Sequence, residues 1–150
     1  MNHLSAKIGT EVQDLQMLRK AGQTMSIISV RYIVTDVEAA IAFYTKLLGF
    51  QLDFHPAPGF ARLSLNGFHL LLNQPGAGGA GQTTNQGVPT PGGWNRIQLE
   101  IDDLNQMVET LKNAGCHFRS EIITGNGGRQ ILVNDPSGNA VELFESARPG

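Results

Sequence analysis

Residues 29–36 read SVRYIVTD and residues 96–103 read RIQLEIDD, and these two stretches decide how the chain is built. Each alternates in the manner of a β-strand and ends in an aspartate of the kind that opens a helix. An apolar helical pattern follows each aspartate and stops at a glycine, Gly49 in one case and Gly115 in the other. Because the same order of signals occurs twice, we interpret the chain as two copies of one unit.

Each unit is predicted to run strand, helix and then three strands. The first helix starts at the capping box Thr35-Asp36-Val37-Glu38, the second at Asp102-Asp103, and Asn66-Gly67 is a strong hairpin signal. The strand patterns of the first unit lie at 28–34, 51–54, 60–65 and 68–73. Those of the second unit lie at 96–101, 116–122, 129–133 and 140–144. We therefore expect an α+β fold in which two βαβββ modules form a cupped mixed sheet.

The segment before the first unit, residues 1–24, is expected to be an extension with one extra helix. Thr10-Glu11-Val12-Gln13 is a capping box, and Val12, Leu15 and Leu18 would share one helical face. Such a short helix needs a surface on which to lie.

The domain itself is predicted to span residues 25–150. Its modules lie at about 26–74 and 94–146. Residues 75–93, between them, are dense in glycine and proline, so they form either a flexible connector or a binding loop.

Composition excludes several classes of function. The chain has 150 residues, a net charge of −2 and one cysteine, Cys116. Without a basic surplus no nucleic-acid partner is expected, and no apolar run approaches the roughly 20 residues of a membrane span. A cytoplasmic location is expected, because one cysteine cannot form an internal disulfide and the N-terminus lacks the apolar core of a signal peptide. Cys116 itself is expected to be a small core residue.

Two stretches carry a family resemblance. Val34 to Phe50 reads VTDVEAAIAFYTKLLGF, and Asp135 to Leu143 reads DPSGNAVEL. Together with the repeated unit they resemble the vicinal oxygen chelate superfamily, which includes glyoxalase I, extradiol dioxygenases, fosfomycin-modifying enzymes and bleomycin-resistance proteins. The resemblance covers about residues 26–146. It implies the fold and says less about the reaction, since one scaffold hosts many chemistries.

The resemblance also implies a metal position inside the cup, with ligands from the first and the last strand of each unit. The matching residues here are Ser29, Leu71, Arg96 and Glu142. Only Glu142 is a typical ligand, and an arginine stays protonated. We therefore expect no cofactor, and an ion pair of Arg96 with Glu142 where relatives place the metal. A divalent metal on Glu142 and a further ligand such as His69 is the alternative.

Strand alternation extends these positions into one predicted binding face. From the first unit this face would carry Ser29, Arg31, Ile33, Arg62, Ser64, His69, Leu71 and Asn73. From the second it would carry Arg96, Gln98, Glu100, Ala140, Glu142 and Phe144. The opposite face would pack on the helices through Val30, Tyr32, Val34, Ile97, Leu99, Ile101, Val141 and Leu143. The polar face is either a solvated sheet surface or a pocket, and three arginines against two glutamates favour an anionic ligand.

Other residues could complete such a pocket. Phe54, Phe60 and Trp94 could cover a ligand from the rim, and His69 is either a general base or a polar wall residue. The glycine-rich stretch 125–129 lacks the helix of a phosphate loop and is expected to be a mobile hairpin. The predicted ligand-binding residues are Ser29, Arg31, Arg62, His69, Trp94, Arg96, Gln98, Glu100 and Glu142.

Three hypotheses follow for the function. The first is a metal-independent binding protein of the bleomycin-resistance kind, which holds a small molecule in a cup completed by a second copy in a homodimer. The second is a lyase or dioxygenase of the glyoxalase kind that uses a divalent metal. The third is a protein that has kept the fold without a ligand. The homodimer is also favoured because each unit leaves a sheet edge exposed.

Overall fold

The computed structural model describes residues 12–14, 16–17, 20, 22 and 27–147. The strands of the first unit are β1 (Ser29–Ile33), β2 (Gln51–Ala57), β3 (Phe60–Leu65) and β4 (Phe68–Asn73). Its helix is α2 (Val37–Ala42), which continues as the π-helix η1 (Phe43–Leu47). The strands of the second unit are β5 (Ile97–Glu100), β6 (Ile123–Thr124), β7 (Gly128–Asn134) and β8 (Ala140–Ser146), and its helix is α3 (Leu104–Asn113).

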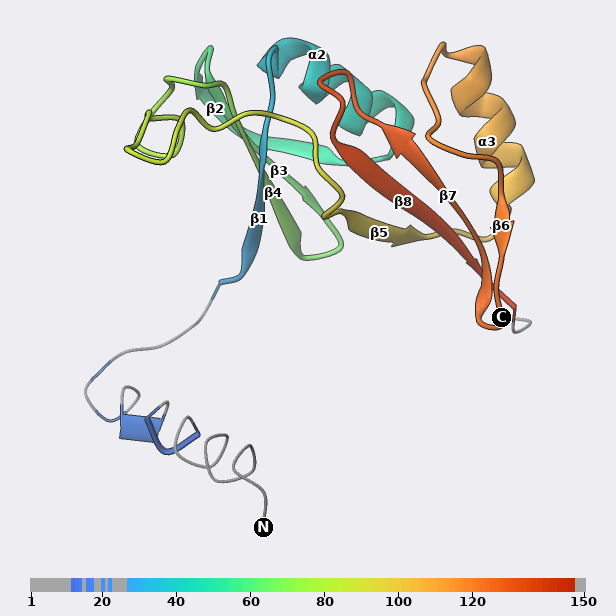
Figure 1. Ribbon diagram of the computed structural model, residues 1–150, viewed down its shortest axis with the longest axis horizontal. Helices are drawn as coiled ribbons and strands as arrows, with labels where there is room; N and C mark the ends of the chain where they lie inside the picture. The colour runs from blue at the N-terminus through green and yellow to red at the C-terminus, as the bar shows by residue number, and fades with distance from the viewer. Residues whose placement is uncertain (1–11, 15, 18–19, 21, 23–26, 148–150) are drawn as a thin grey trace.

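The strands form two four-stranded sheets, in the orders β1-β4-β3-β2 and β5-β8-β7-β6 (Figure 1). In each sheet the first and last strands of the unit run parallel, whereas the other neighbours run antiparallel. The predicted fold class, α+β with two βαβββ units and mixed sheets, is therefore confirmed.

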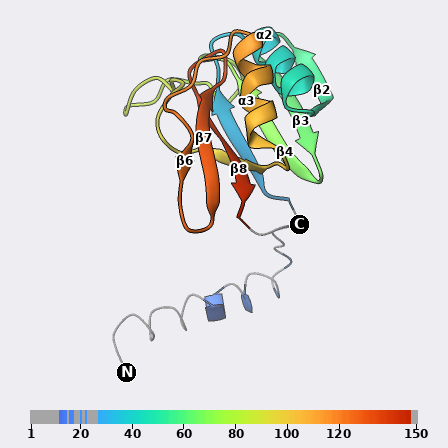
Figure 2. The ribbon, with the colours of Figure 1, turned by 90° about the vertical axis from the view of Figure 1, so that its right-hand side faces the viewer.

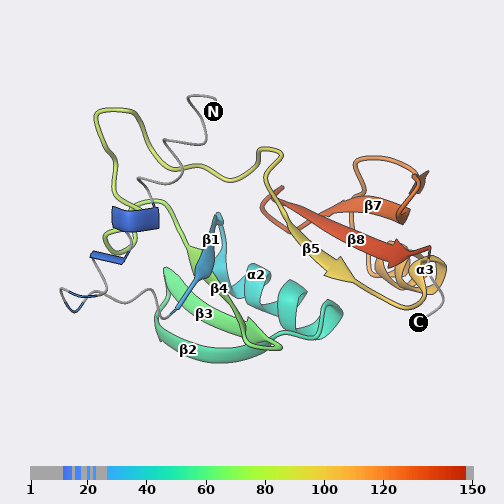
Figure 3. The ribbon, with the colours of Figure 1, turned by 90° about the horizontal axis from the view of Figure 1, so that it is seen from below.

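The helices lie together on one side of the molecule. Figure 2 shows α2 and α3 side by side in front of the sheets. Seen from below, each helix covers one face of its own sheet, and the opposite faces of both sheets point away from the helices (Figure 3). The apolar core lies between each sheet and its helix, and it is continuous across the two units.

The strand alternation predicted from the sequence is correct. The eight residues assigned to the helix side either belong to the core or pack against it. Val34, Val141 and Leu143 are 0% exposed, and such burial stabilises the fold by about 25 cal/mol per Å² of apolar surface. On the other face, Arg31 and Gln98 are exposed.

Two tyrosines from the first unit fasten it to the second. The hydroxyl of Tyr32 accepts from the Ile97 N–H at 2.9 Å and donates to the Ala140 carbonyl at 2.9 Å. It therefore bridges the start of the β5–β8 ladder. The hydroxyl of Tyr44 donates to the Asp135 carboxylate at 2.9 Å, and burial and that charge raise the pKa of Tyr44 well above 10.0. The phenol thus remains a donor at physiological pH.

The expected strand at 116–122 is wrong. This segment forms only an isolated bridge, between Phe118 and Val133, before the short strand β6 begins at Ile123. The Arg119 N–H donates to the Leu132 carbonyl, as in a strand pair. The Arg119 side chain, however, donates to Asn134, Gly93 and Gly138, and the segment does not pair along its length. Side-chain hydrogen bonds of this kind compete with a regular ladder.

The first helix also departs from expectation, because a π-helix replaces its second half. The consecutive residues Phe43 and Tyr44 are only 6% and 0% exposed. A wider turn allows neighbouring large side chains to face the same core. Cys116 is half-buried against the core, in agreement with its expected role.

The glycine-rich connector begins with ordered turns. The Gly76 N–H donates to the Gly81 carbonyl, and the Gln82 side chain donates to the carbonyls of Gly76 and Gly78. A Cβ at position 81 would lie 2.4 Å from the Gln74 carbonyl oxygen, so only glycine fits there. The predicted hairpin at 125–129 is a tight turn closed by Gly125 and Gly128.

The N-terminal helix is only partly described. Residues 12–14, 16–17 and 20 are helical, and Leu15 and Leu18 of the predicted apolar face lie outside the described residues. Val12 is 50% exposed and Met17 is 67% exposed.

Glu145 supplies a pH-dependent contact at the start of α3. Its carboxylate accepts from the Leu104 N–H at 2.7 Å and from Arg129 at 2.9 Å. The Leu104 hydrogen bond and then Arg129 lower the pKa of Glu145 from its usual 4.5. A lowered folded-state pKa contributes stability that is present above pH 4.5 and is lost as the pH falls through the lowered value.

We therefore expect Glu145→Gln to reduce the acid sensitivity of the fold. Urea midpoints of the variant and the wild type, each measured at pH 7 and at about pH 3, should differ most at pH 7. An equal difference at both pH values would mean that the Glu145 contacts do not depend on its charge.

Candidate functional site

The polar face of the first sheet is a regular array set by strand register. Arg62 on β3 and Arg31 on β1 both lie opposite Leu71 on β4. One layer further along, Ser64 and Ser29 both lie opposite His69. The predicted residues of the first unit therefore lie on neighbouring positions of one face.

Arg31 is held by a buried amide. Its Nη1 donates to Oδ1 of Asn73, which is 2% exposed at the end of β4. The Asn73 amide in turn donates to the Ala77 carbonyl in the connector at 3.4 Å. Arg31 is thus exposed to solvent but tied to the start of the connector.

Arg62 stands beside the aromatic pair at the rim. Its guanidinium carbon lies 5.7 Å from the centre of the Phe54 ring, and the rings of Phe54 and Phe60 meet edge to face at 6.4 Å. Phe54 is 49% exposed. A cation over an exposed ring is a weak contact, about 0.5–1 kcal/mol, so it orients Arg62 without neutralising its charge.

The polar face of the second sheet is centred on Glu142. One carboxylate oxygen, Oε1, accepts from Nε of Arg96 at 3.1 Å and from Nη2 at 2.9 Å. The other oxygen accepts from the Gln98 amide. The Glu142 side chain is 9% exposed and that of Arg96 30% exposed. The predicted ion pair is confirmed, and both oxygens of Glu142 are already occupied by donors.

The residues at the metal position that the resemblance implies do not fit a divalent ion. Leu71 offers no donor atom, and the guanidinium of Arg96 has no lone pair to offer a metal. Glu142 alone is one ligand where a usable site needs about three. Nowhere in the described part of the chain do three His, Cys, Asp or Glu residues gather closely enough to hold a metal.

A cavity of about 280 Å³ lies on this second polar face. Its lining residues are Trp94, Arg96, Arg119, Ser120, Ile123, Gln130, Ile131 and Leu132. Trp94 and Arg96 were predicted, whereas the other six residues, Arg119, Ser120, Ile123, Gln130, Ile131 and Leu132, were missed. Gln130 lies opposite Phe144 and Leu132 lies opposite Glu142, so the alternation applied to β8 would have found both if it had been extended to β7. No pattern in the sequence marked Arg119 or Ser120.

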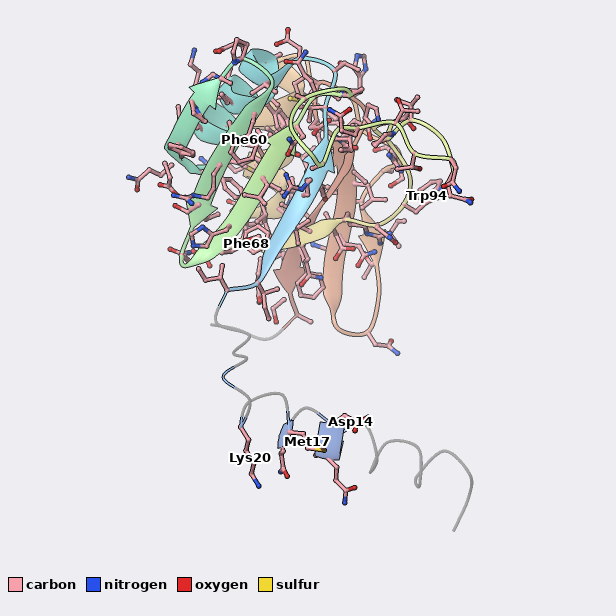
Figure 4. All side chains as sticks on the ribbon, turned by 90° about the vertical axis from the view of Figure 1, so that its left-hand side faces the viewer. Asp14, Met17, Lys20, Phe60, Phe68 and Trp94 are labelled. Atoms are coloured by element: carbon pink, nitrogen blue, oxygen red, sulfur yellow. The ribbon has the colours of Figure 1, made fainter. Side chains whose placement is uncertain are left out.

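Within the described part of the chain, no hydrogen bond joins the polar face of one sheet to the polar face of the other. Among the described residues, the hydrogen bonds of these faces stay within one sheet or reach a neighbouring loop, as with Arg31–Asn73 and Arg96–Glu142. Figure 4 places Phe60 on the first sheet and Trp94 at the far edge of the molecule. The aromatic residues expected along one rim therefore belong to two separate half-sites.

Two sheets of this order, each with one helix and one polar face, define a protein of the paired βαβββ class. Comparison with known proteins places it more closely. The chain belongs to the Glyoxalase/Bleomycin resistance protein/Dioxygenase superfamily, whose sequence profile matches residues 26–143.

Individual relatives agree with this assignment. The protein CFP32 of Mycobacterium tuberculosis is 31% identical over 119 residues, which cover 76% of this chain but 43% of CFP32. The chain therefore spans less than half the length of that curated relative. A superfamily member from Sphaerobacter thermophilus is 27% identical with a TM-score of 0.64, covering 81% of this chain and 98% of that one. TnmS3, an antibiotic-binding protein from Streptomyces sp. CB03234, shares the fold at 21% identity, with a TM-score of 0.62 and coverage of 83% and 99%.

The described residues contain no helix that is both long and apolar enough to cross a membrane.

Proposed function

We propose that this protein binds a small anionic molecule on its polar sheet faces and does so without a catalytic metal. The observation that carries the metal-free part of the proposal is the Arg96–Glu142 pair, which places a guanidinium 2.9 Å from the carboxylate at the family's ligand position. Two N–H groups of the Arg96 guanidinium donate to the same oxygen, Oε1, and give Glu142 the positive partner that a metal would otherwise be. TnmS3 shows that a protein of this fold can serve as an antibiotic-binding protein.

The charge of the polar faces supports an anionic ligand. Four arginines lie on or beside these faces, against two glutamates, and one of the glutamates is paired with Arg96. They are Arg31, Arg62, Arg96 and Arg119, with Glu100 and Glu142. His69 is a half-buried wall residue opposite two serines, where it can donate a hydrogen bond to the ligand.

A second copy of the chain would complete the cup. Each chain offers two half-sites that point away from its helices, and β1 and β5 are edge strands of their sheets. Exposed edges tend to be covered or paired, so a homodimer that sets one half-site against another would satisfy both needs. The cytoplasm is the expected compartment, since the lone Cys116 is half-buried and free.

Light scattering at micromolar concentration is expected to give twice the 16.2 kDa mass of the chain. A mass of 16.2 kDa at that concentration would contradict the homodimer and leave two open half-sites.

Ligand binding is tested by the thermal midpoint of unfolding in the presence of small carboxylates and their amine counterparts. A ligand at about 100 times its Kd should stabilise the fold by about 2.7 kcal/mol, which raises the midpoint by several degrees. The rise should be largest for carboxylates and should fall in Arg62→Gln. Stabilisation by divalent metals instead would favour a lyase or dioxygenase of the glyoxalase kind. No stabilisation by any compound would favour a fold that has lost its pocket.

A further inference from the structure

Trp94 is the one tryptophan of the chain, and it stands largely in solvent at the mouth of the second half-site. It is 68% exposed, which is unusual for so large an apolar side chain. The guanidinium of Arg119 covers one part of its ring, with the Arg119 carbon 4.7 Å from the ring centre. The part of an exposed tryptophan ring that the cation does not cover is a flat apolar surface on which a ligand can stack.

Arg119 is fixed by three neutral acceptors on different parts of the fold. Nε donates to Oδ1 of Asn134 at 2.7 Å, Nη1 to the Gly93 carbonyl at 2.7 Å and Nη2 to the Gly138 carbonyl at 2.9 Å. The Gly93 bond holds the backbone next to Trp94, while the guanidinium contacts its ring. The Arg119 side chain therefore holds Trp94 in two ways, by its hydrogen bond to the preceding Gly93 carbonyl and by its contact with the Trp94 ring.

The charge of Arg119 is not balanced by a carboxylate. Among the described residues its hydrogen-bond partners are one amide and two carbonyls, and no ion pair includes it. A guanidinium has five N–H groups, so two remain after these three bonds. The neighbouring Arg96 is neutralised by Glu142. The cavity therefore has one unbalanced positive charge beside one flat ring.

We infer that this cavity takes a flat aromatic carboxylate, with Trp94 as the stacking surface and Arg119 as the residue that both holds Trp94 in place and attracts the carboxylate. The volume of about 280 Å³ suits a single aromatic ring with its carboxylate. The inference rests on the proposed function and specifies its ligand. It predicts that affinity depends on both the shape and the charge of the ligand. A ligand with a saturated ring would not stack on Trp94, and a ligand with an ammonium group would not be attracted to Arg119.

Because Trp94 is the only tryptophan, its emission reports on this site alone. We would titrate the full chain with benzoate, benzylammonium and cyclohexanecarboxylate, exciting at wavelengths that these compounds do not absorb, and measure binding in parallel by calorimetry. Benzoate should change Trp94 emission saturably, with a Kd of about 1 mM, and bind about tenfold more tightly than either of the other compounds.

Two pairs of variants separate the roles. Trp94→Phe should keep most of the calorimetric affinity and Trp94→Leu should lose about tenfold, since only phenylalanine retains a flat ring. Arg119→Lys should lower both the anisotropy of Trp94 emission and the affinity for benzoate, because lysine lacks the planar fork. Asn134→Asp keeps the acceptor for Arg119 but adds a negative charge. This variant should preserve the anisotropy of Trp94 emission and lower the affinity for benzoate.

The outcomes distinguish the inference from the function on which it rests. Benzoate binding by calorimetry without a change in Trp94 emission, or equal affinity for cyclohexanecarboxylate, would overturn the inference while the binding function stands. An unchanged anisotropy in Arg119→Lys would remove the positioning role. If none of the three compounds binds and small carboxylates do not raise the thermal midpoint either, both the inference and the proposed function fail.

Discussion

Replacing Asp135 by alanine is expected to destabilise the fold by about 3–4 kcal/mol, more than any other single change considered for this chain. The carboxylate is 4% exposed and accepts from the Tyr44 hydroxyl, from the N–H groups of Ser137 and Asn139, and from the Asn139 side chain. Removing it leaves buried donors from both units without an acceptor, and each unsatisfied group costs about 1–3 kcal/mol before relaxation.

Urea unfolding at fixed protein concentration measures this loss as a shift of the midpoint at constant slope. Tyr44→Phe is the partial version, since it removes one donor, and should cost about 1–2 kcal/mol. Asp36→Ala is the matched control, because Asp36 is an exposed aspartate that caps α2 through the Ala39 N–H, and its loss should cost about 1 kcal/mol. A cost for Asp135→Ala no larger than that of Asp36→Ala would show that the joint between the units is not held by this carboxylate.

Removing Arg96 alone should destabilise the protein by about 1–3 kcal/mol, because Arg96→Ala leaves the Glu142 carboxylate half-satisfied in a site where its side chain is only 9% exposed. Removing both partners should cost less than the sum of the single changes. A double-mutant cycle with Arg96→Ala and Glu142→Ala should give a coupling energy of about 1–2 kcal/mol.

A control for the double-mutant cycle is available at the other oxygen of the Glu142 carboxylate. Gln98 also donates to Glu142, so Gln98→Ala should couple to Glu142→Ala more weakly, as expected for a neutral donor. Additive effects of Arg96→Ala and Glu142→Ala would mean that the two residues do not interact in solution. Arg96 would then not take the place of a metal beside Glu142.

The fold could be predicted because its signals are local and occur twice. Asp36 and Asp103 cap the two helices, although the N-cap of the first is Asp36 and not Thr35 of the predicted capping box, and the alternation placed Val34 and Leu143 in the core. The segment 116–122 has the apolar pattern of a strand, which is why a strand was predicted there. The prediction was wrong because the Arg119 side chain makes three hydrogen bonds that a regular strand would not accommodate. Such long-range bonds have no period that a sequence reveals.

The site was predictable only along the strands that contain the family's ligand positions. Strand phase and the resemblance together identified Arg96 and Glu142 as partners, and the structure confirms the pair. Arg119 was missed because it lies in an irregular segment, and its role depends on meeting Trp94 from the connector. The separation of the two polar faces could not be predicted, because the packing of α2 beside α3 is set by the whole core.

The central claim is that Arg96 and Glu142 replace a metal, and the metal content of the purified protein tests it most directly. The full chain would be incubated separately with Ni²⁺, Zn²⁺, Fe²⁺ and Mn²⁺, desalted without chelator and analysed, with Glu142→Gln treated in the same way. We predict less than about 0.1 ion per chain for every metal in both proteins, because a single carboxylate already occupied by donors cannot hold a divalent ion through desalting. About one ion per chain in the wild type, lost in Glu142→Gln, would contradict the account.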